Sequence, residues 1–227
     1  MEASQVLSML GYKQWLVLTE CLVVTTFKFK VYKYPSEIYS GLVQYPATAL
    51  SLVAKRVSDF VKRNSDPRMA LHLYCLNLYD GAWVGKPSKP GIAVLLYDGN
   101  GETHGRSSDG FAWALDIEGA VDLTGPRTYQ EVNQLGDSLK AAMGMANSWM
   151  SGITVPTVDE KLILGAWEWY NDLLEQSPEL GAGSFVLIEV MQKVTLYLDL
   201  CCVQCLIVTA GFFSLYQVVS RLCLATY

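Results

Sequence analysis

The segment IYSGLVQYP at residues 38–46, continued by ATALSLVAKRVSDFV at residues 47–61, decides the fold. Its first part is an apolar run that predicts a strand from Ile38 to Tyr45, and Pro46 suits the first turn of a following helix. In the second part apolar residues recur at helical spacing, while the charged residues lie largely on other faces. That apolar set consists of Leu50, Val53, Ala54, Val57 and Val61.

Strand patterns flank this segment on both sides. Upstream, FKFKVYKY at residues 27–34 alternates bulky and basic side chains, which predicts a strand that ends at Pro35. Downstream, a turn at residues 64–67 precedes two predicted strands, Met69 to Leu78 and Gly91 to Tyr97, with a polar loop between them. Strands in this hairpin-like order favour antiparallel pairing.

Two capping-box patterns mark helix starts in the second half of the chain. TYQE at residues 128–131 and TVDE at residues 157–160 each place a hydroxyl three residues before a carboxylate. After the second helix, Ser184 to Met191 predicts a strand in which Glu189 is the only charge. Together the elements predict an α+β fold, an antiparallel sheet with helices packed on one face.

Composition narrows the classes of function. The chain has 227 residues, 51% of them hydrophobic, and a formal net charge of -5 without a basic stripe, which argues against a nucleic-acid partner. The six cysteines are not spaced as a disulfide framework. A C-x-x-C pair at 202–205 has apolar flanks and no second pair or histidine cluster, so no metal site is predicted.

The C-terminal tail has two interpretations. Residues 200–220 contain no charge and are about as long as a membrane span requires, so they are a candidate membrane helix. Several polar residues dilute the hydrophobicity, and a buried apolar C-terminal helix explains the stretch equally well. The N-terminus lacks a signal peptide's layout, so localisation is left unknown apart from this candidate membrane association.

A small polar loop after the turn at residues 98–101 holds His104, Arg106 and Asp109. Such a group could indicate a catalytic cluster. Turn composition favours a solvated loop instead, and we assign it no chemistry.

The chain contains, in this order, the blocks VVTTFKFKVY (23–32), GLVQYP (41–46), DFV (59–61), DPRMAL (66–71), FAW (111–113), LDI (115–117), DLTGPRTY (122–129) and SFVLIE (184–189). In their order and spacing these blocks resemble FAD-linked oxidases of the berberine bridge enzyme type, particularly fungal members. The resemblance covers roughly residues 23 to 192, about the size of one domain. It divides the chain into a divergent N-terminal segment (1–24), a substrate domain (25–192) and the apolar tail (193–227).

The resemblance implies an FAD-linked oxidoreductase that oxidises a small molecule in secondary metabolism. It also implies a partial chain, because no glycine-rich pyrophosphate loop and no flavin-attaching His or Cys in a matching context precedes Phe27. Flavin-binding residues are therefore unknown, and a separate flavin-binding partner chain is an expected partner. The alternative is a catalytically inert module that binds a membrane or partner through residues 200–220.

The same resemblance implies a base in the substrate domain that takes a proton from the substrate. Glu189 is the candidate, because it is the lone charge on its predicted strand. Glu189 is at least as well explained by a solvent-facing position, by an edge position, or by pairing with a lysine. Tyr170 and Tyr97 are weaker alternatives for the acid/base role.

Overall fold

The computed structural model describes residues 35–78, 89–137, 149–182, 184–190 and 204–210. The chain divides into two compact units, Met1–Tyr34 and Pro35–Tyr227, and all described residues belong to the second. The strand predicted at residues 27–34 lies outside the described residues, and the predicted domain boundaries stay predictions.

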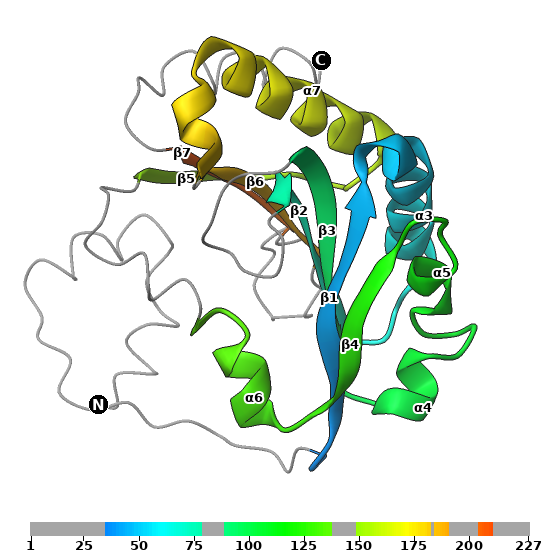
Figure 1. Ribbon diagram of the computed structural model, residues 1–227. Helices are drawn as coiled ribbons and strands as arrows, with labels where there is room; N and C mark the ends of the chain where they lie inside the picture. Colours follow the sequence, from blue (N-terminus) through cyan, green and yellow to red (C-terminus); the bar gives the residue numbers. More distant parts are fainter. Residues whose placement is uncertain (1–34, 79–88, 138–148, 183, 191–203, 211–227) are drawn as a thin grey trace, which may run out of the picture. The chain divides into compact units, whose positions relative to one another are not determined.

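A seven-stranded antiparallel sheet with the order β4-β1-β3-β2-β6-β7-β5 forms the centre of this unit (Figure 1). This confirms the predicted α+β class and the antiparallel pairing. The strands are β1 (Ile38–Pro46), β2 (Met69–Leu78), β3 (Lys89–Asp98), β4 (Val121–Arg127), β5 (Trp149–Thr154), β6 (Phe185–Val190) and β7 (Gln204–Ala210).

Two long helices cover one face of the sheet, α3 (Leu50–Arg63) and α7 (Glu160–Gln176) (Figure 1). Their apolar stripes pack on the alternate strand residues that point toward them, and this interface is the hydrophobic core. The shorter helical segments are η1 (Ala47–Ala49), α4 (Glu102–Gly105), α5 (Ala112–Leu115), α6 (Tyr129–Gln134) and η3 (Pro178–Ala182). In Figure 1, α6 is drawn on the other side of β1 and β4 from α4 and α5, so the helices are not all on one face.

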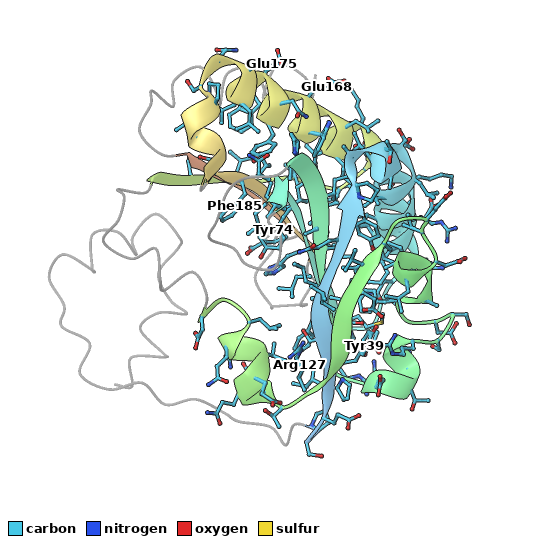
Figure 2. All side chains as sticks on the ribbon, in the orientation of Figure 1. Tyr39, Tyr74, Arg127, Glu168, Glu175 and Phe185 are labelled. Carbon is cyan, nitrogen blue, oxygen red and sulfur yellow. The ribbon has the colours of Figure 1, made fainter. Side chains whose placement is uncertain are left out.

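Alternation along each strand separates two kinds of residue. On β2, Leu71, Leu73 and Cys75 are buried in the core, while His72 and Tyr74 between them lie on the opposite face and are only half buried. Figure 2 shows Tyr74 on the side of the sheet away from α7. We call this side of the sheet, opposite α3 and α7, the polar face.

The two predicted capping boxes have different outcomes. At Thr128 the box is confirmed, since its side chain accepts from the Glu131 N–H and the Glu131 carboxylate accepts from the Thr128 N–H. The box predicted at Thr157 is wrong, because α7 begins at Glu160 and is capped by Asp159. The Asp159 carboxylate accepts the Leu162 N–H at 2.8 Å and so does what the hydroxyl was expected to do.

The apolar C-terminal helix is wrong for residues 204–210, which form β7 between β6 and β5. Its sequence QCLIVTA is rich in β-branched residues, which favour strands. The rest of the tail, 193–203 and 211–227, lies outside the described residues. No helix in the described part of the chain is both long enough and apolar enough to cross a membrane.

Candidate functional site

The polar face brings Glu189 together with a histidine that lies far from it in sequence. On neighbouring strands β2 and β6, His72 and Glu189 are direct cross-strand partners. The Glu189 Oε1 atom lies 3.9 Å from the His72 Nε2 atom, and the two side chains are 21% and 30% exposed. Glu189 thus points away from the core, where its neighbours Ile188 and Val190 lie, and faces a histidine instead of the lysine considered from the sequence.

Tyr74 completes the group on the same strand face. Its hydroxyl lies 3.4 Å from the His72 Nδ1 atom, so His72 stands between a phenol and a carboxylate. Phe185 packs edge-on against Tyr74 with ring centroids 5.7 Å apart. Figure 2 shows Tyr74 and Phe185 beside each other on this side of the sheet. We call His72, Tyr74, Phe185 and Glu189 the sheet-face cluster.

Burial sets the protonation of this cluster. Desolvation lowers the pKa of His72, and the nearby Glu189 charge offsets only part of that effect. Desolvation, with a smaller contribution from Glu189, raises the pKa of Tyr74 to about 12. At neutral pH the cluster therefore contains a neutral imidazole and a protonated phenol.

Such an arrangement can accept a proton from a bound molecule. A carboxylate beside a neutral imidazole has an acceptor for a substrate proton and a neighbour that can orient it. An imidazole between two titratable groups can also pass a proton between them, because each ring nitrogen faces one group.

The two alternative tyrosines have different positions. Tyr170, on α7, is fully buried, and its hydroxyl donates to the Ser184 carbonyl at 3.2 Å, so its role is structural. Tyr97, on β3, is opposite Ala70 in register, which places it on the same face as His72 two residues along β2. The sequence analysis missed His72 and Tyr74 as site residues, although the alternation H-L-Y in a predicted strand already placed them on one face.

A second polar group forms where β3 ends. Asp98 is fully buried, and its Oδ2 atom lies 2.7 Å from the His104 Nδ1 atom of α4. The prediction of a merely solvated loop is therefore wrong for His104, because a buried carboxylate from the preceding strand holds its ring.

No group of three or more His, Cys, Asp or Glu side chains suited to a metal ion occurs among the described residues. Burial raises the pKa of the Cys75 thiol to about 12, so this cysteine is a protonated core residue. The C-x-x-C pair at 202–205 lies where no side chain is described.

Neither a family model nor a curated protein matches the sequence. Solved structures match the fold instead. 6-Hydroxy-D-nicotine oxidase from Arthrobacter nicotinovorans aligns with a TM-score of 0.59 at 13% identity, over 86% of this chain and 43% of that one. A berberine bridge enzyme variant in complex with (S)-reticuline aligns with a TM-score of 0.50 at 7% identity, over 85% of this chain and 39% of that one. The chain therefore spans less than half the length of these proteins and has the fold of part of an oxidase of the berberine bridge enzyme type, as the resemblance predicted.

Proposed function

We propose that this chain is the substrate-side part of an FAD-linked oxidoreductase in which Glu189 is the base that takes a proton from a small-molecule substrate. The observation that carries the proposal is the sheet-face cluster, which gathers Glu189, His72 and Tyr74 on the side of the sheet opposite α3 and α7. The fold shared with two oxidases supports the redox class. A role in secondary metabolism comes from the sequence resemblance.

In this proposal each residue of the sheet-face cluster has a different role. Glu189 is partly exposed and would accept the proton of a substrate hydroxyl or comparable group. His72 lies beside Glu189 and would orient its carboxylate, while Phe185 and Tyr74 offer aromatic surface for an apolar part of the substrate and for the flavin ring that must lie next to it. Removing the proton raises electron density on the substrate and so prepares it for oxidation.

The described residues do not fit the pyrophosphate of FAD. The two long helices begin after the sequences PATA and PTVD, and neither has the glycine-rich turn that lets backbone N–H groups approach a pyrophosphate. In this proposal another segment or a partner chain holds the flavin, which supplies the redox chemistry.

Flavin fluorescence can test the proposal with two related probes. The full chain is titrated with FAD and with riboflavin, which has the same isoalloxazine ring but no pyrophosphate. If the polar face contacts only the ring, both probes are quenched with the same weak affinity. Tyr74→Ala should weaken quenching about fivefold, because an aromatic contact with the ring is lost.

Tyr129→Ala is the matched control, since Tyr129 is 58% exposed on α6 and lies outside the cluster. The control should bind both probes like the parent chain. Absence of quenching by either probe, or equal weakening by the two substitutions, would contradict a flavin-facing role for this face. Much tighter binding of FAD than of riboflavin would show that the chain itself holds the pyrophosphate.

A further inference from the structure

Asp98 is a buried carboxylate whose acceptor positions are filled by three donors. Its Oδ1 atom accepts the Asn100 backbone N–H and the Asn100 side-chain amide, each at 2.8 Å, and its Oδ2 atom lies 2.7 Å from His104 Nδ1. A charge with no exposed surface is tolerated only when such donors compensate for lost hydration. Asp98 therefore fixes the orientation of the His104 ring.

This contact also determines which ring nitrogen of His104 is an acceptor. A carboxylate only accepts, so Nδ1 carries the proton, and in the neutral ring Nε2 keeps its lone pair. The side chain is 34% exposed, and no described residue forms a hydrogen bond with Nε2. His104 thus presents an oriented acceptor to solvent.

That acceptor borders a cleft with a volume of about 290 Å³, at the small end of the range for small-molecule sites. Two buried apolar side chains line it, Phe60 from α3 and Met69 from β2. Exposed polar residues, among them Ser108 and Asp109, also line the cleft. The lining is therefore mostly polar, with a small apolar contribution from Phe60 and Met69, which suits a small ligand with one charged group.

The charges around this cleft favour a cation. The lining holds two carboxylates, Asp66 and Asp109, and one guanidinium group, Arg63, which leaves one negative charge when the His104 ring is neutral. Asp66 is held by Arg68 at 3.2 Å, whereas Asp109 has no ion pair with any described residue. Asp109 is therefore the carboxylate available to a ligand.

We propose that this cleft binds a small primary amine. Its ammonium group donates to His104 Nε2 and pairs with Asp109, and its apolar body packs on Phe60 and Met69. The site involves none of the sheet-face residues, so it does not depend on the proposed oxidoreductase function.

The chain contains two histidines, His72 and His104, which makes a direct test simple. The full chain is labelled with ¹⁵N-histidine and titrated at neutral pH with benzylamine, a protonated amine with one ring. We expect a saturable shift of the His104 Nε2 resonance with roughly millimolar affinity, as befits so small a ligand, and no shift of His72. Asp109→Asn should weaken binding about tenfold, because a charge-assisted hydrogen bond is lost.

Asp116→Asn is the matched control, since Asp116 is an exposed aspartate that does not line the cleft. Unchanged His72 resonances in both variants establish that they are folded. Parallel shifts of both histidines, no saturable shift, or equal weakening by the two substitutions would overturn the proposal. An equal response to benzyl alcohol, which lacks the charge, would also overturn it.

Discussion

Replacing Asp98 by alanine tests how much a buried carboxylate stabilises this fold. The substitution removes the acceptor of three donors, two on Asn100 and one on His104. A buried donor without a partner costs about 1–3 kcal/mol, but His104 and Asn100 are partly exposed and water can replace part of the loss. We therefore expect Asp98→Ala to lower the free energy of unfolding by about 3 kcal/mol, a large share of the roughly 5–15 kcal/mol typical of a domain.

Asp59→Ala is the matched control. Asp59 lies 2.7 Å from the Lys55 Nζ atom, the same distance as Asp98 from His104, but the side chains of Lys55 and Asp59 are 61% and 47% exposed. Water screens an exposed pair, so this substitution should leave stability unchanged within error. Urea denaturation followed by tryptophan fluorescence measures both variants.

A third variant separates charge from hydrogen bonding. Asp98→Asn keeps an oxygen that can accept from Asn100, and its new amide can donate to His104 once the ring adopts the other tautomer. Its loss of stability should therefore be smaller than that of Asp98→Ala. If Asp98→Ala and Asp59→Ala destabilise equally, contact distance rather than burial governs these carboxylates, and the reasoning fails.

Four further outcomes are expected. Tyr45→Phe removes a buried hydroxyl that donates to the Ala114 carbonyl at 2.8 Å, and urea denaturation should show a loss of about 1 kcal/mol. Gly41→Ala should cost about 3 kcal/mol or more in the same assay, because Gly41 has a φ of 147° and an added Cβ would lie 2.5 Å from a carbonyl oxygen of β4. Glu189→Gln should lower the pKa of His72 in an NMR titration, because the Glu189 charge raises it. Burial lowers the pKa of His72 in the folded chain, so the contribution of the neutral ring to stability is present above about pH 6.5 and is lost as the pH falls through the folded pKa. The free energy of unfolding should therefore decline as the pH falls. His72→Asn should flatten this decline in urea midpoints measured between about pH 7.5 and 5.

The elements between residues 38 and 98 were predictable because their signals are local. β1 and β2 are apolar runs that end at Pro46 or begin after a turn, and the predicted bounds agree with the observed ones to within a residue. The helix that became α3 has an apolar stripe that matches the face it buries on the sheet. In these three elements, packing against the core favours the same secondary structure that the local sequence pattern favours.

β4 was not predicted as a strand, because Gly125 and Pro126 interrupt its sequence. The fold tolerates both residues since β4 is the edge strand and pairs only with β1. A proline lacks an N–H, but an edge strand leaves half of its donors without a ladder partner. The position of β4 at the edge of the sheet allows this sequence to form a strand, and no local sequence pattern reveals that position.

The candidate site also depends on strand pairing, which the local sequence does not reveal. Glu189 was found because a lone charge in an apolar strand is visible in the sequence, whereas His72 became its partner only through the register of β2 on β6. A slip of one residue in that register would turn Glu189 toward α3 and α7 and bring Ile188 to the polar face. The burial of Val186, Ile188 and Val190 in the core opposes such a slip, so the same hydrophobic packing that stabilises the sheet also holds the carboxylate beside the imidazole.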